Sequence, residues 1–218
     1  MRSAPVAAEV AFQHKCVHCA QLVQGELAPH ICTACGMPQP VSVSEDYFSA
    51  FGIPRRFGVD RQELEKRFYR ISRALHPDRF TGAGVEANHL SLKRMSFLNQ
   101  AYGSLKDRAR LREYLLECEG IVGEKPSIPA ELAESWFEIQ DLLMEDPEVA
   151  VRKLADFEGE LNRLKEATER RLCSLEKEYD LQPAHHLLEK LAKELQSQSY
   201  LKSIEKDVER IKKNAYSN

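Results

Sequence analysis

The sequence predicts an all-α protein that contains a helical hairpin and a three-helix bundle, preceded by a small cysteine-rich module. Between residues 44 and 119, apolar residues recur at helical spacing and are separated by turn signals. Residues 130–216 are nearly continuous helix-forming sequence, and long helices with short connections favour an antiparallel bundle. Residues 12–40 lack helical periodicity and hold four cysteines. We therefore expect three modules, over 12–40, 44–119 and 130–216.

The composition excludes several classes of partner. The chain has 218 residues, a net charge of −3, 43% hydrophobic residues and 30% charged residues, so no global basic field draws it to nucleic acid. No apolar run is long enough to span a membrane. The N-terminal residues are interrupted by Glu9 and do not resemble a signal peptide. We therefore expect a cytoplasmic protein with neither nucleic-acid nor membrane partners.

Four helices are predicted in the middle segment. Ser44 is a natural N-cap for a short first helix, and Asp60 is one for the second. The second helix carries one apolar stripe with steps of four, three and four residues: Leu64, Phe68, Ile71 and Leu75. Pro77 then disfavours helical backbone at the residue before it, so this helix should end there. The other two helices are expected at about 90–106 and 109–118.

The last segment predicts three longer helices. The first spans about 130–145, and the pair Asp146-Pro147 stops it and starts the second, because Asp caps a helix and Pro suits its first position. Pro183 separates the second helix from the third. The apolar face of the third helix shifts at residues 196–199, and Tyr200 lies at that shift.

A His-Pro-Asp tripeptide, His76-Pro77-Asp78, lies between two of the predicted helices. The tripeptide alone is a weak signal, but it directly follows a capped amphipathic helix and precedes a polar loop and a second amphipathic helix. Pro77 fixes its own φ and restricts the residue before it, so the loop is held open at little entropic cost. The alternative is an ordinary turn in which Pro77 merely ends a helix.

Three segments around this loop carry a family resemblance: 46–54 (DYFSAFGIP), 75–80 (LHPDRF) and 112–116 (REYLL). With the helical sequence that follows, they resemble the HscB-type J-domain co-chaperones of iron–sulfur cluster assembly over about residues 44–216. The resemblance implies a J-domain that stimulates ATP hydrolysis by an HscA-like heat-shock-cognate chaperone. It also implies a C-terminal bundle that delivers an IscU-like iron–sulfur scaffold protein to that chaperone. The chain itself would then not be an enzyme.

The surface expected to meet the chaperone lies beside the loop. Lys66, Arg70 and Arg73 share one helical face at i, i+4 and i+7, and Arg67 lies next to them. Alone, such a stripe is usually a solvated face. Beside the His-Pro-Asp loop it predicts a docking surface for an acidic groove, with fast and salt-sensitive association.

The resemblance also implies a scaffold-binding face on the first and last bundle helices. The matching positions are Leu132, Ala133, Trp136 and Phe137 on the first helix and Tyr200 on the last. Ala133 stands where a larger apolar residue is common in the family. The alternative for Leu132 and Trp136 is burial in the bundle core, which is the commoner role of a helical apolar stripe.

The cysteine-rich module has the spacing of a metal site. Cys16 and Cys19 form one Cys-x-x-Cys pair, and Cys32 and Cys35 form another after twelve intervening residues. Two such knuckles predict a tetrahedral four-thiolate zinc site of zinc-ribbon or rubredoxin-like type, with iron as the alternative metal and disulfides as the structural alternative. Four thiolates suffice, so the nearby histidines are not expected to be ligands.

Two rival functions remain open. One is a general J-protein with other clients. The other is a thiol redox protein that uses one Cys-x-x-Cys pair, which would need an exposed cysteine of low pKa on a thioredoxin-like strand–helix unit. The hairpin and the bundle carry apolar stripes of their own, so metal removal is expected to unfold residues 12–40 alone.

Overall fold

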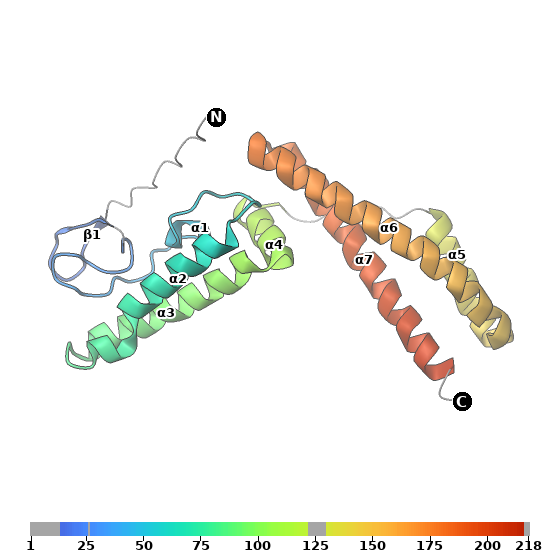
Figure 1. Cartoon of the computed structure of the whole chain (residues 1–218), viewed down its shortest axis with the longest axis horizontal. Coiled ribbons are helices and arrows are strands. Elements are labelled where there is room, and N and C mark those ends of the chain that lie inside the picture. The colour runs from blue at the N-terminus through green and yellow to red at the C-terminus, as the bar shows by residue number, and fades with distance from the viewer. Residues whose placement is uncertain (1–13, 26, 122–129, 216–218) are drawn as a thin grey trace. The chain divides into compact units, whose positions relative to one another are not determined.

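The fold comes from a computed structural model, which describes residues 14–25, 27–121 and 130–215. The chain forms two compact units, and the boundary between them along the sequence falls between Cys118 and Glu119. The first contains the cysteine-rich module and a helical hairpin, and the second contains long helices (Figure 1). The all-α prediction is therefore confirmed. Most of the Gly- and Pro-containing stretch expected between the last two modules, residues 122–129, lies outside the described residues.

The cysteine-rich module is built from two short antiparallel pairings. Strands β1 (His14–Lys15) and β2 (Leu22–Val23) pair on either side of the first cysteine pair. An isolated bridge between Ile31 and Pro38 closes the second pair in the same way. Val23 is fully buried against the cysteines, so the module has a small core of its own.

The helices of the first unit are α1 (Tyr47–Ala50), α2 (Arg61–Leu75), the 3-10 helix η1 (Pro77–Phe80), α3 (Val85–Lys106) and α4 (Arg108–Cys118). Asp60 caps α2 as predicted, because its side chain accepts hydrogen bonds from the backbone N–H groups of Gln62 and Glu63. The prediction for α1 was wrong, because Asp46 rather than Ser44 caps it. Asp46 and Ser49 form a reciprocal capping box there, which satisfies two backbone N–H groups at once. Helix α3 also begins about five residues earlier than predicted.

Helices α2 and α3 lie side by side as an antiparallel hairpin (Figure 1). Leu64, Ile71 and Leu75 of α2 are buried as the stripe predicted, and Phe68 stacks on Tyr102 of α3 with ring centroids 4.3 Å apart. The 3-10 helix η1 joins the two helices at one end of this hairpin. The hairpin therefore presents the His-Pro-Asp segment at its tip.

The second unit consists of α5 (Ala130–Glu145), α6 (Pro147–Leu181) and α7 (His185–Ala215). Asp146 caps α6 through the backbone N–H of Val149, and the break at Pro183 separates α6 from α7, both as predicted. Helix α7 stays continuous through the shift at 196–199. All three helices contribute to one apolar core, made of Leu132, Trp136, Ile139, Leu154, Phe157, Leu161, Leu201, Ile204 and Val208. Within the described parts of the chain, every helix is too short or too polar to cross a bilayer.

Candidate functional site

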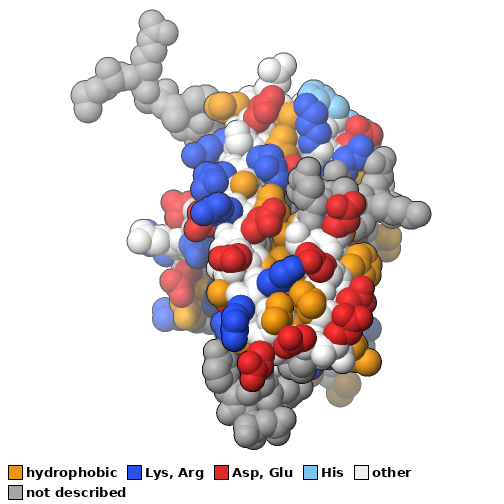
Figure 2. Space-filling view, turned by 90° about the vertical axis from the view of Figure 1, so that its right-hand side faces the viewer, with side chains coloured by type: hydrophobic (Ala, Val, Ile, Leu, Met, Phe, Trp, Pro, Cys, Tyr) orange, Lys and Arg blue, Asp and Glu red, His pale blue; other side chains and the backbone are white. Residues whose placement is uncertain are grey.

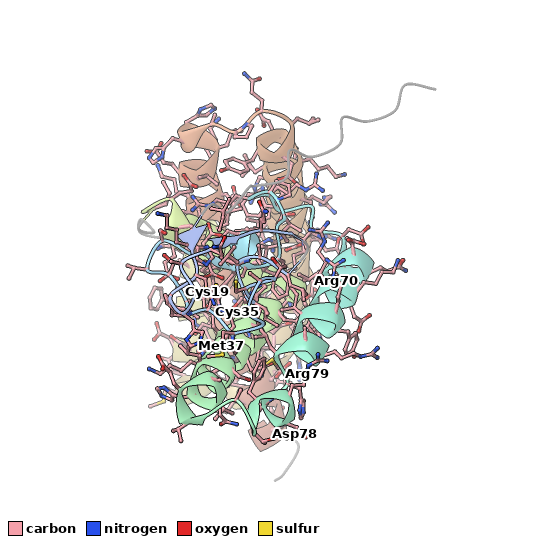
Figure 3. All side chains as sticks on the ribbon, turned by 90° about the vertical axis from the view of Figure 1, so that its left-hand side faces the viewer. Cys19, Cys35, Met37, Arg70, Asp78 and Arg79 are labelled. Atoms are coloured by element: carbon pink, nitrogen blue, oxygen red, sulfur yellow. The ribbon has the colours of Figure 1, made fainter. Side chains whose placement is uncertain are left out.

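The His-Pro-Asp loop projects its two polar side chains into solvent. The side chain of His76 is 58% exposed and that of Asp78 is 85% exposed. They face each other loosely, with His76 Nδ1 3.4 Å from Asp78 Oδ2. Figure 3 shows Asp78 and Arg79 at the turn beyond α2, and Arg70 on α2 itself. These side chains are available to a partner, since neither His76 nor Asp78 is committed to the protein's own core.

Helix α3 holds this loop in place from beneath. The hydroxyl of Ser91 donates to the carbonyl oxygen of Leu75 over 2.5 Å, and both residues are buried. The amide of Asn88 reaches the carbonyl oxygen of Pro77 at 3.5 Å, and Phe80 anchors η1 in the core. Carbonyls at a helix end need such partners when they are buried. The loop is therefore preorganised, although no sequence motif pointed to Ser91 or Asn88.

The four basic residues predicted beside the loop do not behave alike. Lys66, Arg70 and Arg73 are exposed on α2. Arg67 instead donates to the carbonyl oxygens of Phe51 and Gly52 at 2.8 and 2.9 Å, and it pairs with Glu63. The first three side chains therefore lie at the surface of α2, while Arg67 mainly holds the end of α1 against α2.

The four cysteines converge as the spacing predicted. All four sulfur atoms lie within 4.8 Å of one another, with Cys16 Sγ 3.6 Å from Cys35 Sγ and Cys19 Sγ 3.7 Å from Cys32 Sγ. A tetrahedron with metal–sulfur bonds of about 2.3 Å has edges of about 3.8 Å. The four thiols are free of disulfides and fit a single tetrahedral metal ion. The sulfur positions therefore match the metal-site prediction rather than its disulfide alternative.

Each knuckle turns back on its first cysteine. The backbone N–H of Ala20 donates to the Cys16 carbonyl, and that of Gly36 donates to the Cys32 carbonyl, so the two turns are equivalent. In each turn the residue that donates this hydrogen bond has a positive φ, +60° at Ala20 and +72° at Gly36. Glycine adopts this conformation freely, whereas alanine does so under strain. The knuckles lie in turns between short strands, and no strand–helix unit of the kind a thioredoxin-like enzyme uses flanks Cys16 or Cys32 in the described residues.

The sulfurs differ in their environments. Cys16 and Cys32 are buried, whereas Cys19 and Cys35 are partly exposed. Burial opposes ionisation of Cys16, but hydrogen bonds from the backbone N–H groups of Cys19 and His18 and from neighbouring thiols lower its pKa to about 6. Cys35 accepts a hydrogen bond at its sulfur from the backbone of Met37, yet burial and the three adjacent sulfurs raise its pKa to about 12. The first thiolate therefore forms readily, and a cation is needed to hold all four.

Gln39 connects the two knuckles. Its side chain is fully buried, its amide nitrogen donates to Cys16 Sγ at 3.3 Å and to the Met37 carbonyl at 2.9 Å, and its amide oxygen accepts from the backbone N–H of Val17 at 3.2 Å. Hydrogen bonds to a ligand sulfur position it and tune its charge. Gln39 thus orients the Cys16 sulfur through a hydrogen bond, and the cysteine spacing did not reveal this role.

Arg94, on α3 of the hairpin, lies buried against this module. Its side chain is 1% exposed and forms an ion pair of 2.5 Å with Glu45, whose side chain is equally buried. It also donates to the carbonyl oxygens of Gln39 and Pro40 and lies 3.2 Å from His30 Nδ1. Burial lowers the pKa of Arg94, while Glu45 counteracts that shift. One guanidinium therefore joins the cysteine-rich module, the segment that follows it and the hairpin.

His30 takes part in this network through both of its ring nitrogens. Its Nε2 lies 2.7 Å from the carbonyl oxygen of Ala50, and its Nδ1 faces Arg94. Burial, and next the Arg94 charge, lower the pKa of His30 to about 3. The neutral ring therefore donates at Nε2 and accepts from Arg94 at Nδ1.

The residues matched to a scaffold-binding face differ in how far they are buried. Leu132 and Trp136 are buried in the bundle core, where the Trp136 ring stacks on Phe157 at 5.4 Å, so their burial favours the core alternative. Phe137 is 61% exposed and Ala133 is partly exposed. Tyr200 is half-buried and packs against the core. Figure 2 shows exposed hydrophobic side chains interspersed with acidic ones on the face that it draws.

An exposed His-Pro-Asp loop at the tip of a helical hairpin is the arrangement of a J-domain co-chaperone, and comparisons with known proteins agree. No protein-family model matches the chain. The HscB homolog of Bordetella avium is 31% identical over 138 residues, which cover 61% of this chain and 80% of that protein. The co-chaperone HscB of Proteus mirabilis is 40% identical over 76 residues, or 44% of its length, and the mouse iron–sulfur cluster co-chaperone HscB is 33% identical over 52% of its length. The chain thus spans about half the length of these last two relatives.

Solved structures agree on the fold. Human HscB matches with a TM-score of 0.64 and 24% identity, covering 91% of this chain and 98% of that one. HscB from Vibrio cholerae matches with a TM-score of 0.51 and 24% identity, covering 78% and 99%. The chain belongs to the HscB family of co-chaperones.

Proposed function

We propose that this protein stimulates ATP hydrolysis by an HscA-like heat-shock-cognate chaperone and delivers an IscU-like iron–sulfur scaffold to it. The observation that carries the proposal is the exposed His-Pro-Asp loop, held by α3 at the tip of the hairpin. The ATPase site would belong to the partner, so the protein acts as an adaptor. The proposed modules are residues 12–40, 44–119 and 130–216, for metal binding, chaperone stimulation and scaffold binding respectively.

The loop and the exposed basic face of α2 form the proposed chaperone contact. His76, Pro77 and Asp78 would enter the partner's groove, while Lys66, Arg70 and Arg73 would meet its acidic rim. Fixed geometry lowers the entropic cost of binding, and complementary charge speeds association. Arg67 would contribute through the fold, because its guanidinium is held by backbone carbonyls.

The test is the substitution His76→Gln. Stimulation of the chaperone ATPase should be abolished while the melting temperature stays within about 1 °C, because an exposed side chain contributes little to stability. His89→Gln is the matched control, since His89 is also exposed on this hairpin. If His76→Gln stimulates as well as the parent protein, the J-domain mechanism is wrong for this chain.

The scaffold would bind the exposed face of α5 around Phe137. An exposed aromatic on a bundle helix is a typical interface anchor. Phe137→Ala combined with Tyr200→Ala should weaken scaffold binding at least tenfold and leave ATPase stimulation by the J-domain unchanged. Leu181→Ala is the matched control, because Leu181 is an apolar residue 88% exposed elsewhere on the bundle. Full-strength scaffold binding by a stably folded double variant would rule out this face.

The four-thiolate cluster would hold Zn²⁺, with iron as the alternative metal. The sulfur spacing fits a tetrahedral ion, and such a site supplies folding free energy rather than chemistry. Metal analysis of protein purified under reducing conditions tests this directly. One tightly bound zinc per chain is expected, whereas four reactive thiols without metal would favour the thiol redox alternative.

A further inference from the structure

The metal-binding module and the hairpin share one buried polar network. Arg94 projects from α3, yet its hydrogen bonds reach the backbone of Gln39 and Pro40 and the ring of His30, all in or next to the module. The same Gln39 donates through its side chain to Cys16 Sγ. Gln39 alone therefore links Cys16 Sγ to Arg94, so that a movement of this sulfur can shift the guanidinium.

The network continues from Arg94 to the functional loop. Ser91 lies one helical turn before Arg94, on the same buried face of α3. Its hydroxyl holds the carbonyl oxygen of Leu75, the residue directly before His76. A change in the position of α3 at Arg94 therefore acts on the last turn of α2 and on the start of the loop.

We propose that Gln39 and Arg94 couple the four-thiolate site to the His-Pro-Asp loop, so that the metal-binding module controls the J-domain. The control of the J-domain rests on the function proposed above, whereas the coupling itself does not. With the metal bound, the two knuckles are fixed and the acceptors of Arg94 stay in place. Without it, the knuckles separate, and the buried charges of Arg94 and Glu45 draw water into the contact between module and hairpin.

This proposal is the opposite of the autonomy that the separate apolar stripes predict. A module joined to its neighbour only by chain would unfold alone when stripped of metal. A module joined by three polar contacts to a buried guanidinium, which also pairs with Glu45, should share its stability with the hairpin. Linkage then requires the effect to be reciprocal, so that a substitution that disturbs the hairpin must weaken metal binding by the module.

Hydrogen exchange of the full chain tests the coupling. The chain is loaded with Zn²⁺ or stripped by a high-affinity chelator under reducing conditions, and amide exchange is followed by mass spectrometry. Stripping should speed exchange at least tenfold in residues 91–98 of α3 and in 71–75 of α2. Residues 150–161 of α6, in the other compact unit, should not respond. Unchanged exchange in the hairpin would overturn the proposal.

Substitutions test the route through Arg94. In the double variant Arg94→Met with Glu45→Gln, which removes both buried charges, metal should change hairpin exchange less than twofold. Co²⁺ affinity, measured by chelator competition, should fall at least tenfold. Lys93→Met is the matched control, because Lys93 is exposed on the same helix turn, and it should change neither readout. A tenfold metal response that persists in the double variant overturns the proposal.

A conservative variant covers the case in which the double variant does not fold. Arg94→Lys keeps the charge beside Glu45 but lacks the planar fork that reaches two carbonyls and His30. In this variant, metal should slow amide exchange in the hairpin by a factor between those of the parent and the double variant. Its Co²⁺ affinity should likewise lie between theirs. Parent-like values in both measurements would overturn the role of Arg94.

The ATPase assay separates this proposal from the one on which it rests. Loaded protein should stimulate the chaperone at least fivefold more than stripped protein. Equal stimulation by both forms overturns the control of the J-domain, even where exchange shows coupling. Failure of loaded protein to stimulate at all refutes the proposed function and the control with it, while the exchange result still decides the coupling.

Discussion

Trp136 and Arg94 are large buried side chains, one in each compact unit, and they hold their surroundings by different means. Trp136 lies in an apolar core shared by three helices and stacks on Phe157. Arg94 is surrounded by a carboxylate, two backbone carbonyls and an imidazole. Apolar contacts are non-directional and tolerate small shifts, whereas a buried charge is costly unless its partners stay in place. The first unit should therefore respond to metal, acid and single polar substitutions to which the bundle is indifferent.

The largest expected effect separates two adjacent residues of the bundle. Trp136→Ala should lower the free energy of unfolding by about 3–5 kcal/mol, because it opens a cavity in the core. Phe137→Ala, one residue away and 61% exposed, should change it by less than about 0.5 kcal/mol. Urea unfolding followed by circular dichroism measures both. A large loss in the Phe137 variant would show that this ring supports the core rather than a partner.

The next prediction compares two ion pairs with the same separation of 2.5 Å. Glu45→Gln leaves the Arg94 charge buried without its counter-ion and should cost about 3 kcal/mol in the first unit. Glu138→Gln breaks the exposed pair with Lys153 and should cost less than about 0.5 kcal/mol. Trp136, the single tryptophan, reports on the bundle alone, so its fluorescence transition should be unchanged in the Glu45 variant. Equal costs for the two substitutions would contradict the comparison.

Acid should also distinguish the two units. His30 has a folded pKa of about 3 against an ordinary value of 6.5, so the unfolded chain binds the extra proton between these values. The contribution of neutral His30 to stability is complete above about pH 6.5 and declines as the pH falls toward 3, by up to about 1.4 kcal/mol per pH unit. Unfolding of the zinc-loaded parent and of His30→Asn between pH 7.5 and 5 measures the difference. Parallel pH profiles for the two proteins would mean that His30 does not contribute.

The smallest expected effect lies in the two knuckles. Ala20→Gly should stabilise the metal-loaded module by about 1 kcal/mol, because it relieves a positive φ. Gly36→Ala should destabilise it by a similar amount, although nothing lies within 4 Å of the added Cβ. Denaturant unfolding at fixed zinc concentration should show opposite signs. A common sign would show that the two turns are not equivalent.

The sequence predicted the helices well because caps and apolar periodicity are local signals. The breaks between the bundle helices lie where Asp146-Pro147 and Pro183 indicate. The cysteine spacing likewise predicted the sulfur cluster. The N-cap of α1 was misplaced by two residues because Ser44 and Asp46 are both good caps, and only Asp46 finds Ser49 in position to complete the box.

The contact between the module and the hairpin could not be predicted in the same way. Gln39 and Arg94 are 55 residues apart, and no spacing rule joins them. A signal was nevertheless present, because Arg94 falls within the buried stripe of α3, formed by Ala87, Ser91, Arg94, Leu98, Ala101 and Leu105. A charge at a core position needs a buried partner. The position of Phe137, about 100° around the helix from Trp136, in contrast follows from helix geometry alone, and its side chain is exposed.

The unequal burial of the four sulfurs gives the metal site an entrance. Cys16 and Cys32 are enclosed by Val23 and Gln39, while Cys19 and Cys35 remain within reach of solvent. A competing chelator must therefore attack from the Cys19–Cys35 edge and displace those two thiolates before it reaches the enclosed pair. Metal exchange should then proceed in two steps of different rate, and the enclosed pair should set the lifetime of the bound ion.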